Sequence, residues 1–243
     1  MLAAMVVVRN EADPFLQQTL AQLDRLADVT VVYDDAAEGG TPDLCRSFPR
    51  VDYHRGDRPR AGIDEGVVRR RLWQHTAAHR PEWIVWLDAD EVFEARAEAE
   101  IPGLLRQGDY DVAAFRVFDL WNGTTDVRVD GEWNPWNRFQ PRLARYDPAL
   151  SDAWQTPAIP RSGLPKAYRD AVTFYSHLRI RHYGWSQGED HLRRYLVHRQ
   201  RDLAVLGKVQ PRTESALDPQ AQTEPWMEMR CAPWLEPEGG PRR

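Results

Sequence analysis

Two aspartates separated by a single residue, Asp88 and Asp90, carry the clearest chemical signal in the sequence. In an extended backbone, residues i and i+2 point to the same side, so both carboxylates can face one point just beyond a strand. Carboxylate oxygens suit Mg²⁺ or Mn²⁺, particularly where substrate phosphates complete the coordination shell. The apolar run 83–87 before them is typical of a strand buried on both faces. We therefore predict a divalent-metal site at a strand end, the alternative being a solvated loop.

A second acidic pair, Asp34 and Asp35, ends the strand predicted over residues 29–33. A carboxylate there could accept hydrogen bonds from a base N–H or a ribose hydroxyl, or the pair could simply form a turn. Arginines 69–71 lie within a helix predicted over residues 64–79. One of them could contact a diphosphate, because a guanidinium suits bidentate phosphate contacts. The alternative for this run is a solvated helix face.

The elements that would position these side chains alternate between strand and helix patterns over the first ninety residues, which predicts βαβ units and a mostly parallel sheet. The predicted strands cover residues 5–8, 29–33, 51–54 and 83–87, and the predicted helices begin near residues 14, 41 and 64. Because the acidic clusters follow the carboxyl ends of these strands, they should meet at the edge where open α/β sheets bind ligands.

The second half of the chain has a different pattern. Strands are predicted over residues 112–120 and 174–181, and a helix over 188–206. A further segment, 125–129, could pair near the first of these strands. Residues 131–170 are rich in Pro, Trp and Arg without periodicity, which predicts long loops over a site. The Pro- and Gly-rich composition from residue 207 on predicts an irregular tail.

The composition bounds the function. The 243 residues are 42% hydrophobic and 28% charged, which fits one large folded domain. A net charge of −5 is not typical of nucleic-acid-binding proteins, which usually carry an excess of basic residues. Two cysteines give no disulfide framework, so a reducing cytoplasm is the simplest expectation. No apolar run approaches the length of a membrane span.

The ten tryptophans could include sugar-stacking residues. The loop 133–137 and Trp154 are candidates for an acceptor wall, with packing of the loop onto the sheet as the alternative.

Taken together, these segments resemble the family 2 glycosyltransferases of the GT-A fold. The resemblance covers roughly residues 1–120 and rests on residues 9–11 after the first strand, 31–35, the helix with Arg69, and 86–91. Weaker similarity in the second half includes residues 141–143, 182–185 and 216–219. It implies an α/β fold with a mixed, mainly parallel sheet flanked by helices, built as one catalytic domain over 1–206 with a tail over 207–243. Residues 1–120 would bind the nucleotide sugar and 121–206 the acceptor.

The activity that this resemblance implies is metal-dependent transfer of a sugar from a nucleotide-sugar donor to an acceptor hydroxyl, with inversion. The donor would contact Asn10, Glu11, Asp35, Arg69 and Asp88. A UDP-sugar is favoured as donor and Mn²⁺ or Mg²⁺ as cofactor. The acceptor would be a saccharide, a lipid-linked saccharide or a small molecule.

His182 completes the predicted metal site. It follows the strand 174–181 with the parity of Leu178 and Ile180, the face expected to point inward. The segment 182–185 resembles the place where this family often has a late metal-binding histidine, so we expect His182 to bind metal with Asp88 and Asp90. Imidazole suits Mn²⁺ better than Mg²⁺. The alternative is a core histidine bonded to a backbone carbonyl.

The catalytic base of this family lies well after the metal motif. Asp152 is our candidate for it, ahead of Asp147. The alternative for Asp152 is an exposed loop aspartate with no catalytic role.

Two other functions remain open at this stage. A sugar nucleotidyltransferase usually needs a glycine-rich phosphate loop near the first strand, and residues 9–12 contain no glycine. A non-catalytic carbohydrate-binding module would use the tryptophans, but it would not need Asp88 and Asp90 at a strand end.

Overall fold

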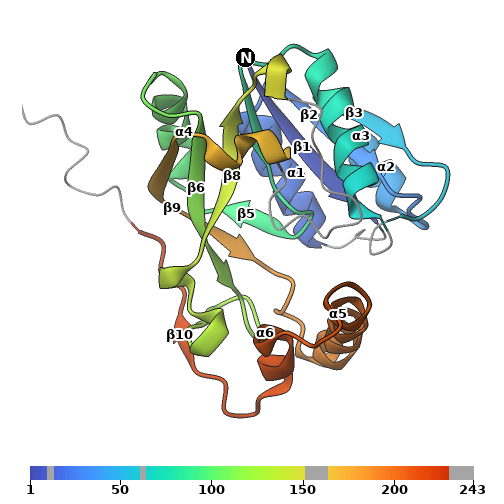
Figure 1. The fold of residues 1–243 in the computed structure, drawn as a ribbon, viewed down its shortest axis with the longest axis vertical. Coiled ribbons are helices and arrows are strands. Elements are labelled where there is room, and N and C mark those ends of the chain that lie inside the picture. The colour runs from blue at the N-terminus through green and yellow to red at the C-terminus, as the bar shows by residue number, and fades with distance from the viewer. Residues whose placement is uncertain (10–13, 61–63, 151–163, 230–243) are drawn as a thin grey trace, which may run out of the picture.

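An eight-stranded sheet with the order β3-β2-β1-β4-β8-β6-β9-β5 is the framework of the computed structural model, which describes residues 1–9, 14–60, 64–150 and 164–229 (Figure 1). The strands are β1 (Leu2–Val8), β2 (Val29–Asp34), β3 (Val51–Arg55), β4 (Trp83–Trp86), β5 (Glu91–Phe93), β6 (Val112–Asp119), β7 (Asp126–Arg128), β8 (Phe139–Arg145), β9 (Thr173–His182) and β10 (Thr223–Pro225). The helices are α1 (Pro14–Leu26), α2 (Thr41–Arg46), α3 (Glu65–Ala78), α4 (Ala97–Leu105), α5 (His191–Leu206) and α6 (Pro211–Glu214). Short 3-10 helices cover Gly131–Trp133, Pro135–Asn137, Pro148–Leu150, Lys166–Asp170, Gly188–Asp190 and Ser215–Leu217.

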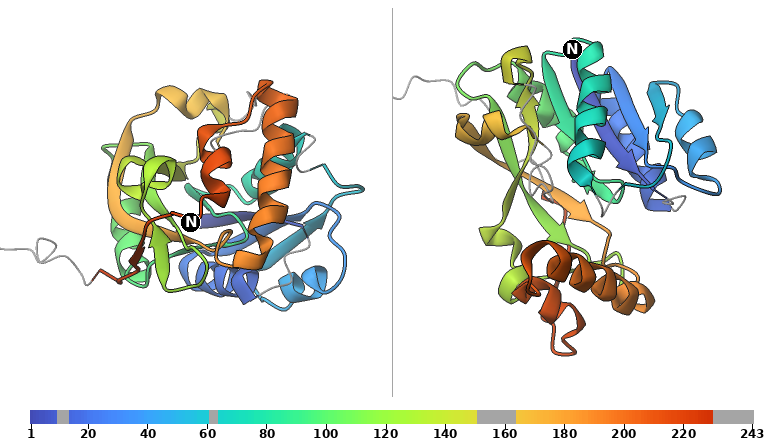
Figure 2. Two further views of the ribbon diagram at one scale, coloured as in Figure 1. Left: turned by 90° about the horizontal axis from the view of Figure 1, so that it is seen from below. Right: turned by 45° about the vertical axis from the view of Figure 1, so that its right-hand side comes forward.

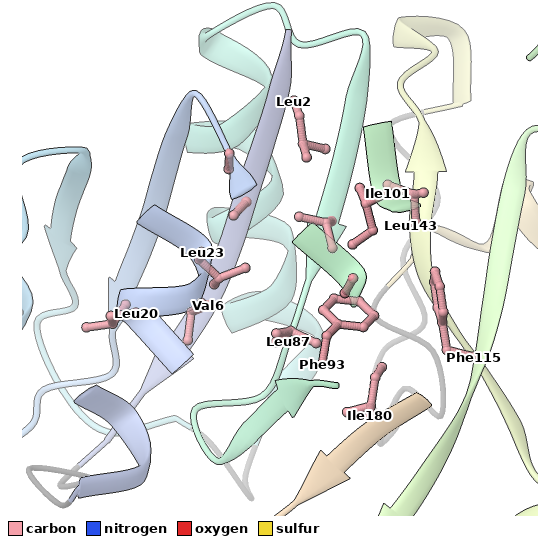
Figure 3. Packing of buried hydrophobic residues seen from close by; sticks show 14 of the residues in the cluster. Leu2, Val6, Leu20, Leu23, Leu87, Phe93, Ile101, Phe115, Leu143 and Ile180 are labelled. Carbon is pink, nitrogen blue, oxygen red and sulfur yellow. The ribbon is translucent and has the colours of Figure 1, made fainter. Parts of the chain in front are cut away.

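The central strands are buried on both faces, as their continuous apolar sequences predict. In β4, Val85 packs with α1 and α4 on one face, while Ile84 and Trp86 pack with α3 on the other. Leu20 and Leu23 of α1 lie in the first of these layers, which Figure 3 shows in close-up. This burial of alternate side chains on opposite sides stabilises the parallel half of the sheet.

Strand direction brings the functional segments to one edge. The strands β3, β2, β1 and β4 are mutually parallel. Next to them, β8 is antiparallel to both β4 and β6, so β6 runs in the same direction as β4. Because β9 is parallel to β6, it has that direction too. The carboxyl ends of β2, β4, β6 and β9 therefore lie along the same edge of the sheet.

The predicted helices of the first half are present. Asp64 begins α3 as its N-cap, with its side chain accepting a hydrogen bond from the Val67 backbone N–H at 3.2 Å. At the far end of the chain, α5 stops at Gly207, whose φ of +69° is the left-handed conformation that favours glycine. Both boundaries agree with those predicted from the sequence.

Two predictions about irregular segments were wrong. Residues 139–145, within the segment predicted as loops, form β8; its buried Arg142 interrupts the apolar pattern that would have identified it. The segment predicted as an irregular tail contains α6 and also β10, which pairs with β7 through backbone hydrogen bonds while its own side chains are exposed. Neither β5 nor α4 was predicted.

Figure 1 and the right-hand view of Figure 2 show α5 and α6 at the end of the molecule away from the amino terminus. Over the described part of the chain, no helix combines the length and apolarity needed to cross a bilayer.

Candidate active site

Asp88, immediately beyond β4, lies between two arginines from different elements. Arg69 of α3 approaches Asp88 Oδ1 at 3.0 Å, and Arg142 of β8 approaches Oδ2 at 3.2 Å. Burial opposes ionisation of the carboxyl, but the charges of Arg142 and Arg69 outweigh it and lower the pKa of Asp88. Arg69 is thus the member of the run 69–71 that faces the site, whereas Arg71 donates to Tyr33.

Arg142 also binds the buried Glu91 at the start of β5. Its guanidinium contacts Glu91 Oε1 at 2.5 Å, and Glu91 Oε2 accepts the Asp88 backbone N–H at 3.0 Å. Burial raises the pKa of Glu91, and Arg142 opposes that rise. This buried pair fixes the backbone of the turn that carries Asp88, so its role is to hold the acidic segment in place.

Asp90 faces His182 across the edge of the sheet. Their nearest atoms, Asp90 Oδ1 and His182 Nε2, are 3.5 Å apart. Burial would raise the pKa of Asp90, but His182 lowers it. Gly184 lies close against this pair, and only a residue without a side chain fits there: a Cβ would lie 2.6 Å from His182 Nε2 and 3.1 Å from Asp90 Oδ2.

The other nitrogen of His182 is held by Asp119, the last residue of β6. The distance from His182 Nδ1 to Asp119 Oδ1 is 2.6 Å, and Asp119 is fully buried. Burial disfavours the imidazolium, yet Asp90 and Asp119 together raise the pKa of His182 to about 10. Asp119 Oδ2 accepts from Arg138 at 2.9 Å and from Arg212 of α6 at 2.6 Å. These contacts hold the pKa of Asp119 well below its usual range against the effect of burial.

The acidic pair after β2 has protein partners of its own. Asp34 Oδ1 accepts the Ala37 N–H at 2.5 Å, a turn-forming contact, and Asp34 also bonds the Tyr53 hydroxyl. Asp35 is fully buried, and both its oxygens lie 2.9 Å from the Arg60 backbone nitrogen. A contact from Asp35 to a nucleotide base stays a prediction.

Of the predicted site residues, the structure brings Asp88, Asp90, Arg69 and His182 to one edge. Asn10, Glu11 and Asp152 lie outside the described residues, as does Trp154. Their predicted roles therefore stay predictions.

The aromatic residues divide into packing and exposed groups. Trp133 is buried among Trp121 and Trp185 and donates its indole N–H to Ser215 at 2.9 Å, so it packs the loop. Trp136 is 51% exposed and its ring meets Phe118 edge-on. Only Trp136 of this pair is placed to meet a ligand.

Sequence reasoning missed Asp119 and the arginines around it. The available signal was the position of Asp119 at the end of the strand predicted over 112–120, the same kind of position that identified Asp88.

A further basic residue at the site is Arg194 of α5, whose guanidinium lies 3.9 Å from Asp90 Oδ2. Both histidines of α5 have partners within the fold: His191 is buried and His198 stacks on Trp185.

In the part of the chain that is described, no three His, Cys, Asp or Glu side chains are grouped to hold a metal ion by themselves. Asp90 and His182 offer two donors, a carboxylate oxygen and an imidazole nitrogen that a cation could bind once Nε2 has lost its proton. Any cation here would need further ligands from a substrate.

Comparisons with known proteins support the fold. No protein-family model and no curated protein matches the sequence. The structure is similar to that of S. aureus TarS residues 1–349 in complex with UDP-GlcNAc, with a TM-score of 0.55 and 12% identity over 89% of this chain and 70% of that chain. Against the same protein in another crystal structure, the TM-score is 0.51 at 13% identity, covering 89% and 69% of the two chains. Against a longer TarS structure it is 0.50 at 14% identity, where this chain covers 42% of that chain. The predicted α/β class is therefore confirmed: the chain has the GT-A fold of the TarS structures.

Proposed function

We propose that this protein is a metal-dependent glycosyltransferase that moves a sugar from a nucleotide-sugar donor, favoured to be a UDP-sugar, to an acceptor hydroxyl with inversion. The observation that carries the proposal is the meeting of Asp88, Asp90 and His182 at the carboxyl edge of a GT-A sheet. Ligands of open α/β sheets bind at that edge. The structural similarity to TarS in complex with UDP-GlcNAc and with UDP supports the donor class.

The donor diphosphate would meet positive side chains at this edge. Arg69 and Arg194 each lie beside an acidic residue of the site and remain partly exposed, with 16% and 32% of their side-chain surface accessible. Both can turn a guanidinium N–H toward a phosphate oxygen, which is the contact that arginine makes best. Asn10, Glu11 and Asp35 are the proposed contacts to the nucleoside.

Two side chains of this edge would suit a divalent cation whose other ligands come from the substrate. Asp90 would supply a hard oxygen and His182 a nitrogen, and the diphosphate would supply further oxygens. Asp88 would join them only by giving up its contact with Arg69 or Arg142. Asp119 fixes the His182 ring through Nδ1, so that Nε2 faces Asp90. A cation bound here would offset the negative charge that develops on the leaving diphosphate. Mn²⁺ is favoured over Mg²⁺ by the imidazole ligand.

In the proposed reaction the acceptor oxygen bonds to the anomeric carbon of the sugar while the bond from that carbon to the diphosphate breaks. The hydroxyl proton passes to a carboxylate, for which Asp152 is the candidate. Arg69 and Arg194 would hold the diphosphate as it leaves. The acceptor is a saccharide, a lipid-linked saccharide or a small molecule.

We propose that the catalytic residues lie in one domain. This domain extends beyond residue 206, the boundary that the sequence predicts. Arg212 of α6 bonds Asp119 directly, so the described residues of the predicted tail contribute to the site. We propose a cytoplasmic location on the basis of the two cysteines, of which Cys45 is buried.

Release of nucleoside diphosphate tests the proposal. Purified protein with Mn²⁺ is incubated with a panel of UDP-, GDP- and CDP-sugars, with and without saccharide acceptors. We expect release of UDP from a UDP-sugar, faster with the right acceptor. Formation of a nucleotide sugar and pyrophosphate from a nucleoside triphosphate and a sugar phosphate would identify a nucleotidyltransferase. Binding of free saccharide without any nucleotide binding would identify a binding module.

A further inference from the structure

The helix α5 carries a row of leucines that the rest of the molecule leaves uncovered. Leu192, Leu196, Leu203 and Leu206 are 58%, 52%, 42% and 45% exposed. Their spacing of four, seven and three residues places them on one face of the helix. We call these four residues the α5 stripe. Arg199 lies between Leu196 and Leu203 on the same face. In soluble proteins, single exposed leucines are common, but several on one helix face mark an interaction surface.

A neighbouring face of α5 already has its partners. His191 bonds the Trp185 carbonyl at 2.6 Å, and His198 stacks on the Trp185 ring. Further along, Asp202 is 2% exposed and accepts from Thr213 at 2.7 Å and from the Gln210 backbone at 3.0 Å. Figure 2 shows α5 at the periphery of the molecule with α6 beside it. The leucines are therefore not part of the packing that holds α5 in place.

The charge on α5 itself beside the stripe is positive. Arg193 and Arg199 are exposed on α5, and Lys208 follows its end. The only acidic residue within α5 is Asp202, which is buried. Before the helix, Glu189 is exposed and Asp190 pairs with Arg193 at 2.8 Å, so Arg199 and Lys208 carry most of the positive charge. The whole chain carries a net charge of −5, so this basic surface stands against the overall charge.

We propose that the α5 stripe docks the protein on an anionic lipid bilayer surface. A helix with leucines on one side and arginines around them lies in the interface, its apolar side chains in the headgroup–acyl boundary and its cations at lipid phosphates. This occupant satisfies both features of the surface, the exposed apolar area and the positive charge.

A second copy of the chain would cover the exposed leucines, but it would not match the positive charge. Arg199 lies between Leu196 and Leu203 in the 4-3-4-3 spacing of a helix-pairing seam. A two-fold pairing through this seam would set the basic surfaces of both copies against each other, without an exposed acid on α5 to compensate. Charge complementarity therefore favours the bilayer.

Docking would also orient the candidate active site. Arg194, in the first turn of α5, is 3.9 Å from Asp90, so the amino-terminal end of the docked helix adjoins the site. If the proposed function holds, the acceptor is then a saccharide carried on a membrane lipid. Docking itself does not depend on the proposed function.

Vesicle co-sedimentation tests the docking. The wild type is spun with vesicles of phosphatidylcholine alone and of phosphatidylcholine mixed with phosphatidylglycerol. We expect binding to the mixed vesicles only, weakened by high salt. The double variant Leu196→Ser/Leu203→Ser should bind at least about tenfold more weakly, because it loses two leucines that would insert into the bilayer. The matched control Val172→Ser/Met227→Ser removes residues that are 60% and 74% exposed outside α5, and should bind like the wild type.

Three outcomes overturn the proposal: no binding of wild type to the mixed vesicles, unchanged binding of the stripe variant, or equal loss in the control. Sedimentation velocity adds a fourth, since self-association that the stripe variant abolishes would make this surface an interface between copies. Should the double variant fail to fold, Arg193→Glu/Arg199→Glu tests the same surface by charge, and binding equal to wild type would overturn docking. UDP binding, measured separately on each protein, distinguishes loss of docking from failure of the proposed function.

Discussion

His182 and Asp119 form a carboxylate–imidazole pair in which Nδ1 of the ring lies 2.6 Å from Oδ1 of the carboxylate. The pair leaves Nε2 facing Asp90 at 3.5 Å. Carboxylates that bind the outer nitrogen of a metal-ligating histidine fix both its orientation and its protonation. Arg138 and Arg212 in turn hold Asp119, so residues from three separate segments position the ring.

Asp119→Asn should weaken Mn²⁺-dependent UDP binding by about 10- to 100-fold, because the ring of His182 loses the charged partner that orients it. Titration calorimetry on the folded protein measures this, with Asp109→Asn as the control because Asp109 is exposed on a turn. Equal affinities for the wild type and Asp119→Asn would mean that Asp119 has no positioning role.

Gly184→Ala should also weaken Mn²⁺-dependent UDP binding. The new Cβ would lie 2.6 and 2.7 Å from Nε2 and Cε1 of His182, so the imidazole must leave its present position facing Asp90. Gly103→Ala is the matched control, since nothing lies within 4 Å of a Cβ there and alanine is the better helix residue. The steric argument fails if Gly184→Ala binds UDP as tightly as Gly103→Ala does.

Replacing either of the two arginines that contact Asp88 should lower the stability of the protein by different amounts. Arg142 is 4% exposed and pairs with the buried Glu91, so Arg142→Ala leaves an unpaired buried charge and should cost about 3–5 kcal/mol of unfolding free energy. Arg69→Ala removes a pair whose partner carboxylate is 39% exposed, and should cost about 0–1 kcal/mol. Urea unfolding measures both, and a loss of similar size in the two variants would contradict the structural role assigned to Arg142.

The stability of the protein should depend on His198 in mildly acidic solution. Burial against Trp185, together with the charge of Arg201, lowers the pKa of His198 to about 4. The unfolded chain, with an ordinary histidine pKa of about 6.5, binds more protons between these values, so the unfolding free energy falls as the pH falls from about 6.5 to about 4. His198→Gln removes this contribution, and its stability should decline less than that of the wild type between pH 7 and pH 5 in urea unfolding. Parallel declines would show that His198 does not titrate in this way.

The parallel half of the fold could be predicted because its strands are buried on both faces. A run such as residues 83–87 has no polar alternation, so both its strand character and the location of Asp88 at its end follow from the sequence. The helix that begins after Asp64 could be predicted equally well, because an N-cap is recognised from neighbouring residues alone.

The second half could not be predicted to the same degree. Its strands pair across long sequence separations, and β8 carries a buried arginine that pairs with Glu91, a residue 51 positions earlier. Asp119 lies beside His182 because β6 pairs directly with β9, and nothing local in the sequence predicts that these two strands are neighbours. The contribution of Arg212 was missed for a similar reason, since α6 is short and its position is determined by tertiary contacts.

The most direct test of the account is UDP binding by the wild type and by Asp90→Asn, measured calorimetrically with and without Mn²⁺. The wild type should bind UDP more tightly with Mn²⁺ than without it. Asp90→Asn should lose at least about tenfold of the affinity measured with Mn²⁺, because a charged ligand is replaced by a neutral amide of the same shape. UDP affinity that is the same with and without Mn²⁺ in the wild type, or unchanged by Asp90→Asn, would contradict the assignment of a metal-dependent nucleotide-sugar site to this edge of the sheet.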